Sequence, residues 1–297
     1  MTQAGRAKAS GRRKAVAIAG RDCATAFQRG ARDCVTGIKA HHSSACAGDA
    51  EAVHRIRIAI TRLRAAVSFF APLVVDAEWL RLKHEIKWLN ASLGAARDSD
   101  VMTAYASRRR HQAWTGRAIG AELDRRRTQD HRRLVRCLRS ARARRLIEML
   151  SVWTEQGRWL ARWEAAVRRG DAEALQAYCA RELNRWRERL IRKGRQLSNL
   201  NAARRHRLRI KTKRFRYMLE ALKDIVTMRS CADIRRIHSA AKRLQRTLGD
   251  LRDLKRFAGL SDQKRDRRHP RRYRRQRDKL RSAAVSAWRE LKQAGRV

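Results

Sequence analysis

Two stretches of this chain, 152 residues apart, share a pattern of histidine, arginine and lysine. Their basic residues recur at spacings of three, seven and ten, which places them on one face of an α-helix. Neighbouring guanidinium groups repel one another unless an anion bridges them, and phosphate oxygens fit them in forked hydrogen bonds. The two predicted cationic faces are His54, Arg57, Thr61 and Arg64 flanked by Arg55 and Arg62, and His206, Arg209, Lys213 and Arg216 flanked by Arg207, Lys211 and Arg214.

A second repeated block follows each cationic face, at an offset of 155 residues. It ends in the sequence Leu-Gly-x-x-Arg-Asp, from Leu93 to Asp98 and again from Leu248 to Asp253. A glycine in a helical stretch either ends the helix or lets another backbone come close. The arginines of the motif, Arg97 and Arg252, either pair with acids or point to a ligand. The helix before each motif predicts a further basic ridge, made of Lys83, His84 and Lys87 in the first copy and of Arg235, His238, Lys242 and Arg243 in the second.

A cationic helix face also has a less specific explanation, because any exposed helix of an arginine-rich protein carries basic residues opposite its apolar stripe. Here the face recurs at matched positions, and almost no acidic residue offsets it, whereas a merely solvated face interleaves glutamate with lysine. The pattern therefore favours anion binding. Two roles stay open for His54 and His206: a pH-sensitive donor to phosphate, or a packing residue.

No metal site, cofactor or catalytic site is predicted. Glu51-x-x-His54 resembles half of a di-iron motif, but Ala203 stands where the second copy would need the glutamate. The six cysteines include no C-x-x-C pair, so neither zinc nor a disulfide framework is indicated, which fits a reducing cytoplasm. The notable acidic pairs are interpreted as helix-end features; they are Asp98 with Asp100 and Asp250 with Asp253.

The composition narrows the class of partner. Across 297 residues, 74 Lys and Arg against 28 Asp and Glu give a net charge of +46. Such a chain pays for its self-repulsion unless counter-ions or a partner neutralise it, so an extended polyanion is expected. Two prolines in the whole chain predict an all-α protein. No apolar run is long enough to span a membrane, and no membrane partner is expected.

The helices that position the basic residues have recognisable starts. Asp49 is expected to cap a helix running to about Phe70, and Asp76 to cap the next, which carries residues 83–93. Asn201 and Ser230 mark the corresponding starts in the second half, the latter in a capping box with Asp233. Further helices are expected at about 13–40, 118–142, 143–168, 171–197 and 271–294, with breaks at Gly48, Gly116, Gly120 and Gly170.

The repeat predicts two helical bundles of about four helices each, related by a pseudo-two-fold axis, in halves of approximately 1–150 and 151–297. The segment from Lys264 to Arg281 holds eleven Lys and Arg and two Asp. It is interpreted as a solvated loop and the start of a basic helix, with an auxiliary polyanion contact as the alternative.

Together these motifs resemble the CHAD family, the conserved histidine alpha-helical domain. The resemblance rests on V-H-R-I-R-I-A-I-T-R-L-R, on H-R-L-R-I-K-T-K-R-F-R-Y and on the twice-used L-G-x-x-R-D, and it covers nearly the whole chain as a single domain, 1–297. It implies two bundles whose basic helices line a central cavity or groove. It also implies binding of inorganic polyphosphate, association with cytoplasmic polyphosphate granules, and no catalysis by this domain. The E-x-E-x-K signature of the catalytic triphosphate-tunnel domain, which accompanies many relatives, does not occur in this sequence.

The resemblance implies contacts at the matching positions of both halves. Thr61 departs from the pattern, because a basic residue usually stands there, as Lys213 does in the second copy. The two halves are therefore expected to contribute unequally. The implied polyphosphate contacts are His54, Arg57, Arg62, Arg64, His206, Arg209, Lys213, Arg214 and Arg216, completed by Lys87, Lys242, Arg97 and Arg252.

The alternative function is sequence-independent binding of nucleic acid. The charge and the eight tryptophans, whose rings can stack on bases, support it, although most of the tryptophans are better explained as helix packing. A polyphosphate-cleaving enzyme would need a metal site or an activated nucleophile, and neither is predicted.

Overall fold

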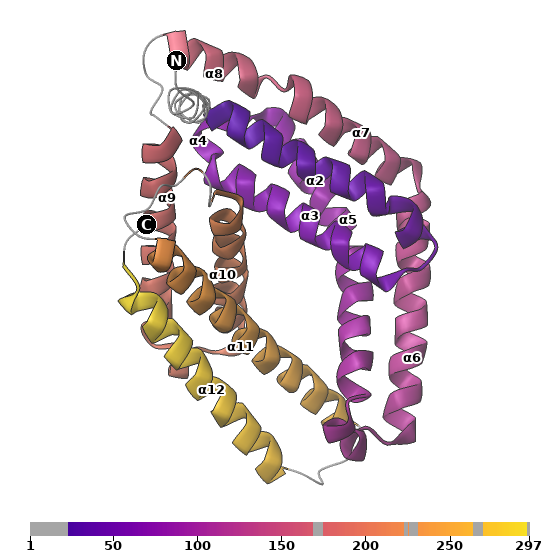
Figure 1. Ribbon diagram of the computed structural model, residues 1–297. Coiled ribbons are helices and arrows are strands. Elements are labelled where there is room, and N and C mark those ends of the chain that lie inside the picture. Colours follow the sequence, from indigo (N-terminus) through magenta and orange to yellow (C-terminus); the bar gives the residue numbers. More distant parts are fainter. Residues whose placement is uncertain (1–22, 169–174, 223–224, 226–230, 264–269, 296–297) are drawn as a thin grey trace, which may run out of the picture.

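The protein is helical throughout the part of the chain that the structure describes. The computed structural model describes residues 23–168, 175–222, 225, 231–263 and 270–295, and every regular element in these ranges is a helix (Figure 1). The predicted all-α class is confirmed. In the described ranges no helix is both long and apolar enough to cross a membrane.

The first half of the chain contributes helices up to residue 168, and the second half the rest. The first set is α2 (Cys23–Cys46), α3 (Ala50–Phe69), α4 (Ala71–Val74), α5 (Ala77–Ala106), α6 (Arg109–Arg139), α7 (Ala141–Gln156) and α8 (Trp159–Arg168). The second set is α9 (Leu175–Gly194), the 3-10 turn η1 (Leu197–Asn199), α10 (Ala202–Leu222), α11 (Cys231–Gln263) and α12 (Pro270–Gln293).

Side-chain caps begin the helices that carry the repeated motifs. The Asp49 carboxylate accepts a hydrogen bond from Glu51 N at 2.8 Å, and that of Asp76 accepts one from Trp79 N at 2.7 Å. Asn201 Oδ1 accepts from Arg204 N at 2.9 Å. Each cap satisfies a backbone donor that the first turn leaves unpaired, and all three confirm the predicted starts. Ser230 lies outside the described residues.

Several predicted boundaries were wrong. α2 continues to Cys46, and α6 runs unbroken through Gly116 and Gly120. The break after α7 falls at Gly157, because a Cβ there would lie 2.4 Å from Trp153 O. The predicted division between residues 150 and 151 falls inside α7. Gly48, with a φ of +92°, makes the predicted break between α2 and α3, whereas Gly170 lies outside the described residues.

Large aromatic side chains lock the first half together. The Phe27 ring meets the rings of Phe70, Trp153 and Trp159 edge-on, with centroids 5.0–5.9 Å apart. All four side chains are buried, and they join α2 and α3 to α7 and α8. An apolar stripe along α3 and its C-cap is also buried; it comprises Val53, Ile56, Ile60, Leu63, Val67 and Phe70.

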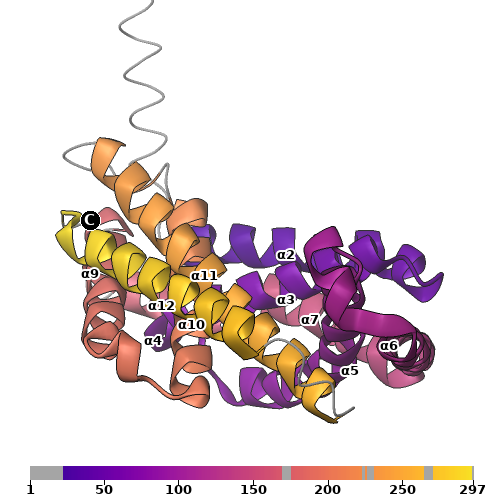
Figure 2. The ribbon, with the colours of Figure 1, turned by 90° about the horizontal axis from the view of Figure 1, so that it is seen from below.

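The helices that carry the repeats form a closed frame (Figure 1). α3 packs against α10 at one corner, and α5 packs against α11 at the opposite corner. Each is backed by another helix: α2 on α3, α6 on α5, α9 on α10 and α12 on α11. Seen from below, α6 and α12 lie on opposite sides of the molecule (Figure 2). The frame thus brings the cationic faces of α3 and α10 to one shared corner.

We expect Phe27→Ala to lower the free energy of unfolding by about 3–5 kcal/mol, because it empties the centre of this aromatic cluster. Urea denaturation measures the change. Leu80→Ala, at a side chain that is 56% exposed on α5, should change stability by less than about 0.5 kcal/mol. Equal losses in the two variants would contradict the assignment of the core.

Candidate functional site

Matched positions of the two repeats lie against each other where α3 crosses α10. The Lys213 Nζ is 3.5 Å from Thr61 Oγ1, and these two residues are 152 apart in the sequence. Arg57 and Arg209, another matched pair, are close enough for the charge of Arg209 to lower the pKa of Arg57. A two-fold axis between the copies would produce such contacts, and the symmetry itself stays a prediction.

The side chains around this crossing form a cationic group drawn from four helices, which we call the junction cluster. Burial, and then the charge of Arg97 above other neighbours, lowers the pKa of His54. Burial and the charges of Arg252 and Arg209 do the same for His206. Both histidines are therefore biased toward the neutral form. The junction cluster consists of His54 and Arg57 on α3, Arg97 on α5, His206, Arg209 and Lys213 on α10, and Arg252 and Arg256 on α11.

Lys213 is the most strongly perturbed member of the junction cluster. Burial lowers its pKa to about 7, with further contributions from the charges of Arg57, Arg209 and Arg216. The ammonium lies 5.4 Å from the centre of the Tyr217 ring, whose π-face offers some stabilisation of the charge. An anion bound beside Lys213 would raise its pKa and so favour the uptake of a proton.

The glycine of each Leu-Gly-x-x-Arg-Asp motif lies beside an arginine of the cationic face; a Cβ would make an ordinary contact at Gly94 and a tight one at Gly249. Arg57 Nη1 donates to the carbonyls of Leu93 and Gly94, both at 3.0 Å. A Cβ at Gly94 would lie 3.8 Å from that nitrogen, and one at Gly249 would lie 3.3 Å from Arg209 Nε. The helices continue through both glycines, so the predicted helix end or backbone approach was wrong. A side chain, not a backbone, uses the space.

The acidic residue of the first motif joins two helices. Asp98 Oδ2 accepts from Arg252 at 3.0 Å and lies 2.9 Å from Arg256 Nη1, so α5 and α11 are tied together beside the junction cluster. Asp98, Asp100, Asp250 and Asp253 lie within long helices, and their interpretation as helix-end features was wrong. Arg256 was missed because its counterpart at the offset of 155, Val101, is not basic.

Two buried nitrogen atoms in the junction cluster lack hydrogen-bond partners. Among the described residues, His206 Nδ1 and Arg209 Nε are buried and form no hydrogen bond. A buried polar atom without a partner costs free energy, and an arriving acceptor recovers it. The arrangement therefore suits an anion with several oxygens.

Two arginine pairs flank the crossing. At one end Arg216 contacts the Glu220 carboxylate at 2.5 Å, and Arg62 lies 3.9 Å from it. His238 Nε2 is 2.7 Å from the same carboxylate, so this predicted residue has a partner. At the other end Arg64 and Arg214 are both half-buried, and the charge of Arg64 adds to burial in lowering the pKa of Arg214.

Not every predicted site residue belongs to this group. Arg55 Nε donates to Glu51 at 2.7 Å on the surface of α3, and Arg243 pairs with Glu290 of α12. Both have a carboxylate partner in the free protein, and their contact with a ligand stays a prediction. The side chains of Lys83, His84, Lys87, Arg207 and Lys242 are exposed, and their contact with a ligand stays a prediction.

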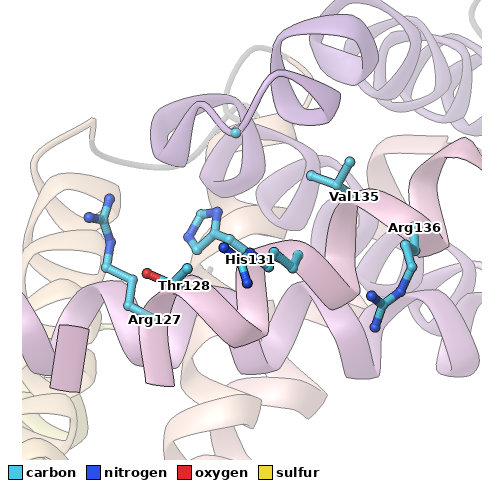
Figure 3. A pocket seen from close by; sticks show the side chains of 7 residues that line it. Arg127, Thr128, His131, Val135 and Arg136 are labelled. Carbon is cyan, nitrogen blue, oxygen red and sulfur yellow. The ribbon is translucent and has the colours of Figure 1, made fainter. Parts of the chain in front are cut away.

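A cavity of about 480 Å³ lies along α6, and none of the predicted site residues lines it (Figure 3). His131 Nε2 and Arg127 Nε both lie 2.9 Å from Asp100 Oδ1, which holds these two lining residues in place. Basic residues four apart on α6, such as Arg127 and His131, were the available sequence signal for this cavity. Nothing in the sequence indicated that Asp100 contacts them. The central concavity shared by the two copies remains a prediction. The lining residues are Gly48, Arg127, Thr128, His131, Arg132, Val135 and Arg136.

We expect the stability of the protein to depend on pH through Lys213. Because its pKa is lowered to about 7 in the folded state from the ordinary 10.5, the unfolded chain holds a proton between these values that the folded chain does not. Raising the pH through this window therefore favours the folded state, and below about 7 the cost of the buried charge is complete.

Lys213→Met should remove this pH dependence. Urea denaturation from pH 6 to pH 10 measures it, with Lys39→Met, at an exposed position of α2, as the matched control. Parallel pH profiles for the wild type and Lys213→Met would contradict the assignment.

The comparisons with known proteins agree with the geometry. The model of the CHAD domain family matches residues 29–262. A crystal structure of the CHAD domain from the plant Ricinus communis superposes with a TM-score of 0.71 at 23% sequence identity, covering 94% of each chain. PptA from Streptomyces chartreusis gives a TM-score of 0.58 at 15% identity, over 91% of this chain and 98% of that one. No curated protein sequence matches. The family match extends over most of the chain and includes both cationic helices, and the protein therefore belongs to the CHAD domain family.

Proposed function

We propose that this protein binds inorganic polyphosphate at the junction cluster and does not cleave it. The observation that carries the proposal is the meeting of the two matched cationic helices, where Arg57, Arg209 and Lys213 lie together with too few carboxylates to neutralise them. Phosphate oxygens would supply the missing negative charge and the missing hydrogen-bond acceptors. Family membership and the net charge of +46 support the same ligand.

A linear polyanion suits the arrangement better than a single small anion. The arginine pairs flank the crossing on both sides, Arg62 with Arg216 and Arg64 with Arg214, while the junction cluster occupies its middle. A chain of linked phosphates can contact several of these groups at once. Each contact would release counter-ions, so the affinity should fall steeply with salt.

The positions of the tryptophan side chains do not favour nucleic acid as the preferred ligand. Single-stranded nucleic acids are held partly by stacking on exposed aromatic rings. The described tryptophans are instead part of the core or its margin: Trp79, Trp153, Trp159 and Trp163 are buried, and Trp88, Trp186 and Trp288 are half-buried. Polyphosphate needs no such platform, because it offers only charge and oxygen acceptors.

The absence of cleavage is part of the proposal. Two carboxylates lie beside the junction cluster: Asp98 is held by Arg252 and Arg256, and the charge of Asp253 interacts with those of Arg209, Arg252 and Arg256. A carboxylate engaged by two guanidinium groups is a poor metal ligand and a poor base. We further propose that binding takes place in the cytoplasm at polyphosphate granules, as the family resemblance implies.

The test replaces three cations of the junction cluster that, among the described residues, form no ion pair with a carboxylate. Arg97→Gln, Arg209→Gln and Lys213→Gln together should weaken the binding of long-chain polyphosphate by about a hundredfold or more. Isothermal titration calorimetry at fixed salt measures the affinity. Competition with single-stranded DNA at equal phosphate concentration measures the preference.

The matched control removes the same charge at exposed positions of α12, through Arg271→Gln, Arg275→Gln and Lys279→Gln. It should weaken binding by less than about tenfold, because distant surface charges are screened. Equal losses would show that bulk charge governs binding. Preference for DNA over polyphosphate, or phosphate release with Mg²⁺ present, would each overturn the proposed function.

A further inference from the structure

The two arginine pairs that flank the helix crossing are matched by the repeat but differ in their surroundings. Arg62 and Arg64 of α3 correspond to Arg214 and Arg216 of α10. One pair combines Arg62 with Arg216, and the other combines Arg214 with Arg64, so each pair takes one arginine from each helix. In a symmetric molecule the two pairs would have the same surroundings, whereas here the surroundings differ.

The pair Arg62–Arg216 is partly neutralised from within the chain. The Glu220 carboxylate lies 2.5 Å from Arg216 and 3.9 Å from Arg62. Tyr217 adds its ring face, 4.7 Å from the Arg216 guanidinium carbon and 5.3 Å from that of Arg62. Arg216 Nε also donates to Gln245 Oε1 at 3.0 Å. A carboxylate held between guanidinium groups takes the place that a phosphate group would take.

The pair Arg64–Arg214 has no such counter-charge. At the offset of 152, Ser68 stands where Glu220 stands in the second copy, and Ala65 stands where Tyr217 does. The Ser68 hydroxyl donates to the backbone carbonyl of Arg64 at 2.7 Å, on the exposed side of α3. Within the described part of the chain, neither guanidinium of this pair forms a hydrogen bond or an ion pair.

Positive charge accumulates further on the same side of α10. Burial and the charges of Lys193, Arg189 and Arg214 lower the pKa of Lys211, so α9 contributes two more cations beside this pair. The cations of this end repel one another, whereas Glu220 relieves the repulsion at the other end. An anion therefore gains more at the Arg64–Arg214 end.

We infer that Glu220 acts as an internal counter-anion that closes one of two matched phosphate subsites, and that the Arg64–Arg214 pair, where Ser68 replaces it, is the open subsite. Polyphosphate held at the junction cluster then continues over Arg64 and Arg214. At the other end a phosphate group must first displace the Glu220 carboxylate. This inference rests on the proposed function, which identifies the ligand as polyphosphate. The difference between the two ends follows from comparing matched positions of the repeat.

The test exchanges the charge between the two ends. Glu220→Gln keeps an acceptor oxygen for Arg216 and His238 but removes the charge, and it should raise the affinity for long-chain polyphosphate about five- to tenfold at low salt. Ser68→Glu places a carboxylate four residues after Arg64 and should lower the affinity by a similar factor. Titration calorimetry measures both, and circular dichroism melting verifies that both variants fold.

Two variants of α8 serve as matched controls, since both positions are exposed there: Glu164→Gln repeats the loss of a negative charge, and Ala161→Glu repeats its gain. Each should change the affinity by less than about twofold. The inference is overturned if Glu220→Gln behaves like Glu164→Gln and Ser68→Glu behaves like Ala161→Glu.

Failure of the proposed function gives a different result. If the wild type prefers single-stranded DNA, polyphosphate is the wrong ligand, and the same four variants measured with DNA still decide whether the two ends differ. If the wild type binds neither polyanion, both the proposed function and the inference are wrong.

Discussion

The structure depends on like charges that the fold forces together at one helix crossing. Arg57, Arg209 and Lys213 approach one another because the apolar stripes behind them on α3 and α10 pack into the core. Hydrophobic burial fixes the positions of the helices. The cationic groups can therefore move apart only by changes in side-chain conformation. The cost appears as the lowered pKa of Lys213 and as buried nitrogen atoms without hydrogen-bond partners. A ligand that supplies negative charge relieves this repulsion, and the relief contributes to the free energy of binding.

The surrounding elements limit that cost without abolishing it. An arginine side chain lies beside the glycine of each repeated motif, and the carbonyls of Leu93 and Gly94 accept from Arg57. Asp98 ties α5 to α11 through Arg252 and Arg256 and adds a negative charge beside the cluster. Glu220 does the same at one end of the crossing. These carboxylates are few, which leaves an excess of positive charge for the ligand.

The repeat in the sequence predicted the helix pair and most of the junction cluster. His54, Arg57, His206 and Arg209 could be found because their spacing is short-range and recurs. The ion pairs of Arg55 with Glu51 and of Arg243 with Glu290 could not be predicted, because the choice of partner depends on side-chain conformation. Arg256 and Glu220 escaped detection because the first copy has no equivalent. A repeat cannot predict functional residues that occur in only one copy, and these residues make the site asymmetric.

The central claim is that bound phosphate supplies the charge missing at the junction cluster, and proton uptake on binding tests it most directly. At pH 8 the Lys213 side chain, with a pKa of about 7, is mostly neutral, and phosphate beside it should raise that pKa and draw in a proton. Calorimetric titration with long-chain polyphosphate in two buffers of different ionisation enthalpy counts the protons taken up. The account predicts an uptake approaching one proton that is largely lost in Lys213→Met. Binding at full affinity with no proton uptake, or with the same uptake in Lys213→Met, would contradict it.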